Sequence, residues 1–221
     1  MNIKACIFDL DGVLVDTARF HYLAWKELAT KLGFDFTEAD NERLKGVSRM
    51  DSLEILLQIG NVTLSEKDKK KYADEKNDRY LEFVLSMTPD DAMPGVREFL
   101  GELKGTKILT ALGSASKNAR VILEKTSLVP YFDAIVDGNL ITKAKPHPEV
   151  FELGARMLRT YPPYCVVFED AVAGIEAAHK AGMKCIGIGS SDVLHEADLV
   201  IPGFTNFRFE NLSLWQNALY I

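Results

Sequence analysis

The segment Phe8–Val13, with the sequence FDLDGV, follows directly on the apolar run Ile3–Phe8, with the sequence IKACIF. A short, apolar and partly β-branched run predicts a buried β-strand. Residues two apart on an extended chain project to the same side, so we expect Asp9 and Asp11 to face one small volume beyond the carboxyl end of this strand. Open α/β sheets bind their ligands at that position.

These two carboxylates allow a functional and a purely structural interpretation. Two like charges so close repel strongly in a partly dry site, and a cation or a shared proton is needed to hold them together. Gly12 would permit the tight turn that such a loop requires. Asp-Gly pairs are also ordinary turn residues, so the segment alone is compatible with a simple turn. The choice depends on what the rest of the chain places beside Asp9.

The composition is that of an ordinary globular protein. The chain has 221 residues, of which 47% are hydrophobic and 26% charged, enough for one large domain or two small ones. The net charge of −6, with no long block of one sign, argues against nucleic acid or an anionic membrane as main partner. No apolar run approaches membrane-spanning length. We expect a cytoplasmic protein, because Lys4 and Asp9 interrupt the N-terminal apolar stretch and the three cysteines lie in strand-like runs typical of free, buried thiols.

A helical block follows the first strand. A helix is expected over about residues 18–31, and further helical pattern continues to about Met87. Ser48 and Ser65 each stand three residues before an Asp, as in capping boxes. Because no convincing strand occurs in this stretch, residues 17–87 are predicted to form an inserted, all-helical cap.

Strands and helices alternate after Pro94. Apolar runs predict strands at 107–112, 133–136, 165–168, 184–188 and 198–201, and helical patterns predict helices at 118–126, 148–158 and 171–181. Such alternation indicates a parallel sheet with helices on both faces. The predicted fold is therefore α/β: a doubly wound, Rossmann-like parallel-sheet core, residues 1–16 and 88–221, that carries the helical cap.

Polar side chains with chemical uses stand at or after the ends of the strand-like runs, namely Asp9, Asp11, Ser114, Lys145, Glu169 and Asp170. Strand ends on one side of a parallel sheet converge, so these side chains are expected to meet. The set suits phosphoryl transfer: carboxylates bind Mg²⁺ together with a substrate phosphate, Ser114 holds phosphate oxygens and Lys145 balances charge.

Each of these residues has an ordinary alternative role. Ser114 or Ser116 could simply cap a helix. Lys145 could be a surface lysine held extended by the following proline. Glu169 and Asp170 could do no more than favour a helix N-terminus. Four such coincidences at four strand ends are less probable than one shared site.

With these motifs the sequence resembles the haloacid dehalogenase superfamily of phosphotransferases, whose four motifs stand in order at Asp9–Gly12, Ser114, Lys145 and Glu169-Asp170. Within it, the chain is most similar to the β-phosphoglucomutase family, over nearly its whole length. The likeness includes Thr17, His21, Trp25, the segment 44–49, Ser52, Lys76 and Asn77 in the cap and Ser114–Asn118 in the core. The segment 136–141 and the tail after Ser190 depart from the family pattern, and neither contains a motif residue.

The resemblance implies an isomerase that interconverts β-glucose 1-phosphate and glucose 6-phosphate through the 1,6-bisphosphate. It implies that Asp9 becomes an aspartyl phosphate and that Asp11 is the general acid and base. Mg²⁺ would be held by Asp9, the backbone carbonyl of Asp11, Asp170 and Glu169, the last either directly or one shell out.

The resemblance also implies a set of substrate-binding residues: Asp11, His21, Trp25, Lys45, Gly46, Val47, Ser48, Arg49, Ser52, Lys76, Ser116, Lys117 and Asn118. Arg49 would clamp the phosphate that is not being transferred, because a guanidinium fork suits that task. For Trp25, packing inside the cap explains the residue equally well. His21 and Lys76 suit polar contact or hinge control.

Two other functions share these motifs. A sugar-phosphate phosphatase would use all four core motifs, with water in place of the sugar hydroxyl. A non-catalytic phosphorylation switch also needs an acidic pocket and a lysine, but it needs an open face and no cap. The expected partners of this protein are small-molecule sugar phosphates, and the expected state is a monomer.

Overall fold

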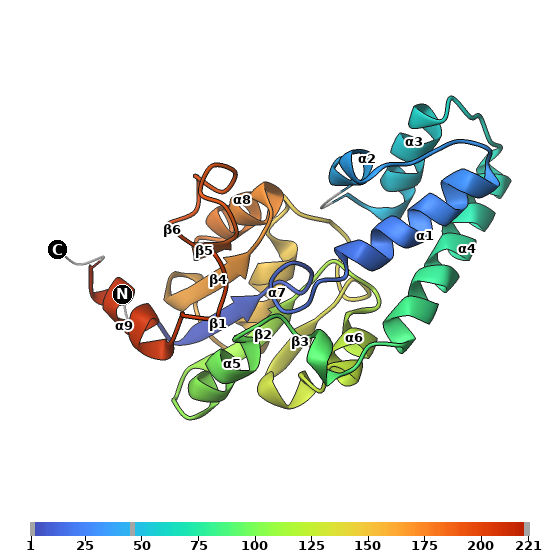
Figure 1. Cartoon of the computed structure of the whole chain (residues 1–221). Coiled ribbons are helices and arrows are strands. Elements are labelled where there is room, and N and C mark those ends of the chain that lie inside the picture. Colours follow the sequence, from blue (N-terminus) through green and yellow to red (C-terminus); the bar gives the residue numbers. More distant parts are fainter. Residues whose placement is uncertain (1–2, 45–46, 219–221) are drawn as a thin grey trace. The chain divides into compact units, whose positions relative to one another are not determined.

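The computed structural model describes residues 3–44 and 47–218, drawn in Figure 1. The chain forms two compact units, Met1–Asp16 with Met87–Ile221, and Thr17–Ser86. The chain passes from the second unit back to the first between Ser86 and Met87, one residue earlier than the sequence pattern places this boundary. We call the first unit the core and the second the cap.

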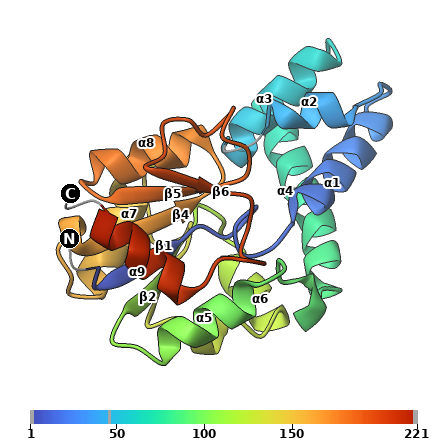
Figure 2. The ribbon, with the colours of Figure 1, turned by 60° about the vertical axis from the view of Figure 1, so that its left-hand side comes forward.

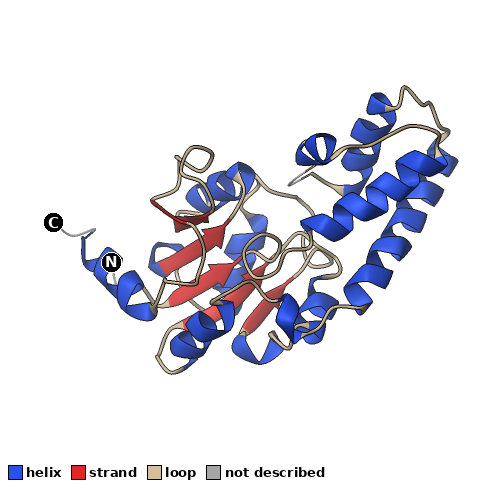
Figure 3. Ribbon diagram, in the orientation of Figure 1, coloured by secondary structure: helices blue, strands red, loops and turns tan. Residues whose placement is uncertain are grey.

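The core is built on a six-stranded parallel sheet with the order β3-β2-β1-β4-β5-β6, coloured red in Figure 3. The strands are β1 (Ala5–Phe8), β2 (Leu109–Gly113), β3 (Ala134–Val136), β4 (Cys165–Glu169), β5 (Lys184–Ile188) and β6 (Leu199–Ile201). The chain starts at β1 in the centre, moves outward to β3, and then returns to build the other half. The predicted doubly wound α/β core is confirmed.

Helices cover both faces of this sheet (Figure 2). They are α5 (Val96–Lys104), α6 (Ala119–Lys125), α7 (Glu149–Met157), α8 (Val172–Lys180) and α9 (Phe209–Ala218), with 3₁₀ helices at Pro89–Asp91, Val129–Tyr131 and Pro162–Tyr164. Helix α7 packs on β1, β2 and β3 and touches α8, which packs on β4 and β5, whereas α5 packs on β2 and α9.

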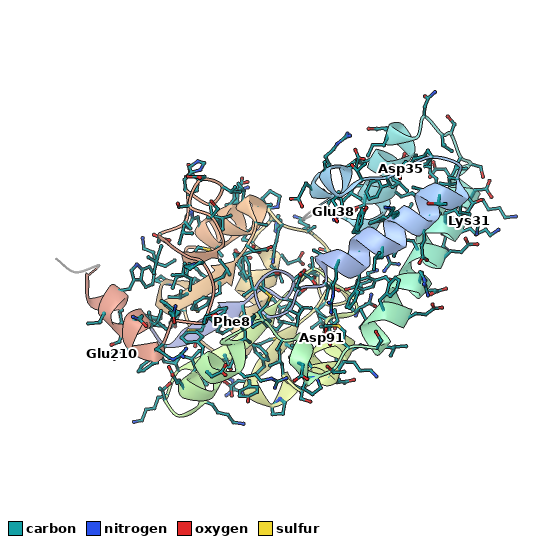
Figure 4. The ribbon with its side chains drawn as sticks, viewed as in Figure 1. Phe8, Lys31, Asp35, Glu38, Asp91 and Glu210 are labelled. Atoms are coloured by element: carbon teal, nitrogen blue, oxygen red, sulfur yellow. The ribbon has the colours of Figure 1, made fainter. Side chains whose placement is uncertain are left out.

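The alternation along β1 explains why both faces are buried. Ile7 belongs to a hydrophobic cluster with Phe151 of α7 and Val167 of β4. Phe8 points to the opposite face, where its ring stacks on Phe168 with 4.7 Å between centroids, and Figure 4 shows it inside the core. On the same face, the ring of Phe99 of α5 contacts the rings of both Phe8 and Phe168. A strand buried on both sides in this way is apolar at nearly every position.

The cap consists of four helices, α1 (Ala18–Lys31), α2 (Glu38–Glu42), α3 (Arg49–Ile59) and α4 (Glu66–Leu85), with no strand among its described residues. Ser48 and Ser65 cap α3 and α4 as predicted, each accepting a backbone hydrogen bond three residues on. The cap has its own hydrophobic cluster around Leu28, Phe36 and Leu53. Polar side chains such as Lys31, Asp35 and Glu38 lie on its surface (Figure 4).

Two helices of the core were not among the elements expected from the sequence, α5 and α9. The missed signal in α5 is Val96, Phe99, Leu100 and Leu103, an apolar stripe at helical spacing that is buried here.

Among the described residues, no helix is long and apolar enough to cross a membrane.

Candidate active site

The candidate active site lies at the carboxyl ends of the two central strands of the core. β1 pairs with β4 so that Phe8 is opposite Phe168, and Asp9 N–H continues the ladder to the Phe168 carbonyl at 2.9 Å. The residues that follow are Asp9–Asp11 on one strand and Glu169-Asp170 on the other. The predicted convergence of these carboxylates is therefore a direct result of strand register.

The loop after β1 turns back on itself within a few residues. Gly12 N–H donates to the Val15 carbonyl at 2.8 Å, and Gly12 has a φ of +76°, in the left-handed region that favours glycine. A Cβ at Gly12 would also collide with the Asp170 carboxylate. Glycine is thus required at this position both for the turn and for the close approach of a carboxylate.

Lys145 joins Asp9, the candidate nucleophile after β1, to Glu169 at the end of β4. Its ammonium donates to Asp9 Oδ1 and, at 2.7 Å, to Glu169 Oε1, and all three side chains are nearly buried. Burial by itself favours the neutral amine, but the charges of Asp9 and Glu169 outweigh it and raise the pKa of Lys145 above its usual value. Lys145 is therefore a fixed positive charge beside Asp9 rather than a surface lysine.

Both carboxylate oxygens of Glu169 are hydrogen-bonded within the protein. Oε1 accepts from Lys145, and Oε2 accepts from the Ala171 N–H at 2.8 Å. The side chain is 1% exposed. This geometry suits a residue that positions Lys145.

The space that Glu169 occupies exists because α8 carries glycine at position 174. A Cβ there would overlap the Glu169 carboxyl group. The sequence analysis did not identify Gly174, although a glycine inside a helical pattern is a signal of close packing.

Gly174→Ala is expected to lower the free energy of unfolding by about 1–3 kcal/mol, because it displaces a buried carboxylate from its two partners. Turnover should fall with it, since Lys145 loses a hydrogen-bond acceptor. Gly101→Ala in α5 is the matched control: nothing lies within 4 Å of a Cβ there, and alanine should stabilise the helix by up to about 1 kcal/mol. Urea unfolding of both variants measures the effect, and equal behaviour of the two would contradict this role for Gly174.

The site as a whole is strongly acidic. Burial raises the pKa of Asp170 to about 8, and the charges of Asp9, Glu169 and Asp11 add to the shift. Lys145 provides one positive charge against four carboxylates. A bound cation would therefore reduce the repulsion among these carboxylates.

Residues 3–44 and 47–218 contain no group of three or more His, Cys, Asp or Glu side chains arranged to hold a metal ion. The donor set is of another kind: the carboxylates of Asp9 and Asp170 with the backbone carbonyl of Asp11. All of these donors are oxygens, and Mg²⁺ is commonly bound by only one or two carboxylates together with waters and substrate phosphate. The residues present therefore fit such an ion.

Ser114 directly follows the last residue of β2, Gly113, and its side chain does not cap a helix. It is 2% exposed, its N–H donates to the Val136 carbonyl at 3.0 Å, and its hydroxyl accepts from the Ser116 N–H at 3.1 Å. The Ser116 hydroxyl accepts in turn from the Asn118 N–H at 3.3 Å. The loop 114–118 is thus shaped by its own serines, with the Lys117 side chain exposed.

The segment 137–149 is fixed on both sides of Lys145. Gly138 N–H donates to the Ser116 carbonyl at 3.0 Å, which joins it to the serine loop. Glu149, at the start of α7, accepts from the Thr142 and Lys143 N–H groups at 3.0 and 2.6 Å. Glu149 is a second residue that the sequence analysis missed, because nothing local distinguishes it from an ordinary glutamate in the first turn of a helix.

In the cap, the predicted substrate residues fall into four groups. Lys45 and Gly46 lie outside the described residues. Val47 is exposed and Ser48 caps α3, whereas Ser52 is buried, with its hydroxyl 3.5 Å from the Val47 carbonyl. Ser52 is therefore placed to support the turn before α3.

Three further cap candidates, His21, Trp25 and Lys76, lie together, with the buried Lys76 ammonium at their centre. Lys76 Nζ lies 2.8 Å from His21 Nδ1 and above the rings of Trp25 and Tyr80, at 4.5 and 5.0 Å from their centroids. Burial and the charges of Lys76 and Arg49 hold the pKa of His21 well below its usual value, so Nδ1 of the neutral ring accepts a hydrogen bond from the Lys76 ammonium. Trp25 is 2% exposed, which supports the packing interpretation of this residue.

Arg49 begins α3 and is half-buried. Its Nη2 donates to Asn77 Oδ1 of α4 at 2.6 Å. Burial lowers the pKa of Arg49, but the nearby Asp74 and Asp78 oppose that shift, and the guanidinium remains charged. The Arg49 guanidinium is thus held in an ordered position on Asn77.

Comparison with known proteins agrees with this arrangement. Residues 3–182 match the family model of the haloacid dehalogenase-like hydrolases. The chain is 40% identical to a β-phosphoglucomutase of Bacillus subtilis, with 95% of this chain and 94% of the relative covered. It is 34% identical to a phosphorylated carbohydrates phosphatase of Thermotoga maritima, with 83% and 84% covered.

A crystal structure described as a β-phosphoglucomutase of Clostridium difficile superimposes with a TM-score of 0.92 at 40% identity, with 99% of each chain covered. The family model, the two relatives and the superposition agree on one ancestry. This chain belongs to the haloacid dehalogenase-like hydrolase family and, within it, to the group that contains the β-phosphoglucomutases.

Proposed function

We propose that this protein interconverts β-D-glucose 1-phosphate and D-glucose 6-phosphate through an aspartyl phosphate and β-glucose 1,6-bisphosphate. The observation that carries the chemistry is the Asp9 carboxylate, held by the Lys145 ammonium beside Asp11 at the end of β1. The choice of a glucose phosphate rests on the likeness to the Bacillus subtilis and Clostridium difficile mutases.

Asp9 is the nucleophile in this proposal. A carboxylate oxygen of Asp9 bonds to phosphorus while the bond from phosphorus to the sugar oxygen breaks, and Asp11 gives its proton to that oxygen. In the second half-reaction Asp11 takes the proton of the attacking sugar hydroxyl, and the phosphoryl group leaves Asp9. Lys145 and the N–H groups around Ser114 hold the phosphoryl oxygens.

Asp9, Asp170 and the Asp11 carbonyl would hold Mg²⁺, and Glu169 would stay outside the ion's ligands with Lys145. The ion would supply positive charge that lets these carboxylates and a phosphate share one site.

The second phosphate of the bisphosphate needs its own cationic site, and we assign it to Arg49. Ser116, Lys117 and Asn118 of the core are assigned to the same end of the sugar. We assign the exposed Val47 and the capping Ser48 to the part of the cap backbone that approaches the substrate. A cytoplasmic monomer remains the expectation from the sequence.

The alternative is a sugar-phosphate phosphatase, a class represented by the relative from Thermotoga maritima. The same core residues serve both reactions, because water can replace the sugar hydroxyl. The two differ in whether phosphate is released. Production of glucose 6-phosphate without inorganic phosphate supports the mutase, and stoichiometric release of phosphate supports the phosphatase.

Arg49→Ala separates the two functions further. A broken charge-assisted clamp costs on the order of 2–5 kcal/mol, so conversion of β-glucose 1-phosphate should fall by at least one order of magnitude. Transfer from acetyl phosphate to Asp9 should fall far less, since that donor has no second phosphate. Both reactions are measured side by side on wild type and variant, and equal losses in the two would remove the case for a mutase built on Arg49.

A further inference from the structure

The partner of the Arg49 guanidinium is a neutral amide. Asn77 lies on the next helix of the cap, and its Oδ1 accepts from Arg49 Nη2 at 2.6 Å. Both residues are half-buried, and the bond joins the first residue of α3 to the middle of α4. A short bond to a half-buried group of this kind restricts the rotamers of a long side chain.

The chemistry of this partner differs from that of its neighbours. Asp74 and Asp78 stand three residues before and one residue after Asn77, and both are exposed. A carboxylate at position 77 would pair with the guanidinium charge and compete with any anion for it. An amide oxygen accepts one N–H bond and leaves the positive charge and the other N–H donors of Arg49 available.

We propose that Asn77 is a positioning residue that fixes the orientation of the Arg49 guanidinium while leaving its charge available for a substrate phosphate. The proposal rests on the proposed function, in which Arg49 binds the phosphate that is not reacting. It adds a determinant of specificity outside the motif residues, because the residue type at position 77 sets how strongly the cap binds a second anionic group.

The direct test is Asn77→Asp, which is nearly isosteric and places a carboxylate against Arg49. We expect KM for β-glucose 1-phosphate to rise by about tenfold, with a much smaller change in kcat. Asn77→Ala removes the bond without adding charge and should raise KM by a smaller factor. An unchanged KM in Asn77→Asp would overturn the proposal.

A matched control distinguishes the local contact from the general charge of α4. Asp78→Asn removes one negative charge from the same helix, and the double variant Asn77→Asp with Asp78→Asn keeps the wild-type net charge. If the contact matters, the double variant keeps the high KM of Asn77→Asp. If the double variant returns to the wild-type KM, the effect is long-range electrostatics and the proposal is wrong.

A second readout does not depend on turnover. The side-chain Nε–Hε signal of Arg49 in ¹⁵N NMR spectra is assigned by its loss in Arg49→Lys. We expect this signal to shift in Asn77→Asp, and we expect glucose 6-phosphate to move it at about tenfold higher concentration than in wild type. An Arg49 signal that is the same in both proteins would contradict the positioning role.

The two readouts separate the proposals. If wild type does not isomerise β-glucose 1-phosphate but the Arg49 signal responds to glucose 6-phosphate and to Asn77→Asp, the proposed function fails and the positioning role stands. If wild type isomerises and Arg49→Ala impairs it while every Asn77 variant matches wild type, the function stands and the positioning role fails.

Discussion

Asp9→Asn is expected to abolish turnover and leave the fold intact. An amide oxygen cannot form the aspartyl phosphate, so no first half-reaction takes place. The fold should survive because the change removes one of four crowded carboxylates, while Lys145 keeps its hydrogen bond to Glu169 at 2.7 Å. Repulsion on Asp170, whose pKa is raised partly by Asp9, is relieved in the variant.

Mass spectrometry after incubation with acetyl phosphate measures this directly, since wild type should gain one phosphoryl group at Asp9 and the variant none. Thermal unfolding of the same sample checks the fold. Asp192→Asn, at an exposed position of the core, is the control and should be phosphorylated normally. A phosphoryl group on any residue other than Asp9, or turnover by the variant, would disprove the assignment.

Asp11→Ala should lower the rate by about 10²- to 10⁴-fold, the usual contribution of a positioned acid–base group. The backbone of the loop is held independently of this side chain, because Asp11 forms a bridge with Val15 and the Gly12 N–H donates to the Val15 carbonyl at 2.8 Å. The carbonyl assigned to Mg²⁺ should therefore stay in place, and Mg²⁺ affinity should change little.

The leaving group distinguishes acid–base catalysis from binding. A sugar alkoxide needs a proton as it departs, whereas acetate from acetyl phosphate leaves without one. We expect Asp11→Ala to lose much less activity with acetyl phosphate than with the sugar phosphate. Equal losses with both donors would mean that Asp11 acts in binding or in shaping the loop, and activity within a few-fold of wild type would exclude any central role.

The predictions from sequence succeeded where the signal was local and repeated. The six strands stand where short apolar runs predict them, within one to two residues at most ends, and α1 has the predicted bounds of Ala18–Lys31. Helix α5 was missed because it begins directly after Pro94 and Gly95, and Gly95 has a left-handed backbone conformation. These two residues are strong turn signals, and they obscured the apolar stripe of the helix.

The residues of the candidate site also differ in whether a local sequence signal could identify them. Asp9 and Asp11 could be identified because two carboxylates interrupt the end of an apolar strand, and Glu169 with Asp170 repeats that pattern on a neighbouring strand. The role of Glu169 could not be predicted, because it depends on the Lys145 ammonium 24 residues away and on the space left by Gly174. The role of Asn77 depends in the same way on Arg49, 28 residues before it.

The sequence by itself determined the six strands, the cap insertion and the carboxylates at the strand ends, together with most but not all of the helices. The reason is that hydrophobic periodicity, and the turns that end strands and helices, are properties of neighbouring residues. Only the tertiary structure decided which buried charge faces which partner: Lys145 between Asp9 and Glu169, Lys76 beside His21, and Arg49 on Asn77. The reason is physical, since a buried charge is stable only where distant segments supply its hydrogen bonds, and that supply is set by packing between elements rather than by spacing along the chain.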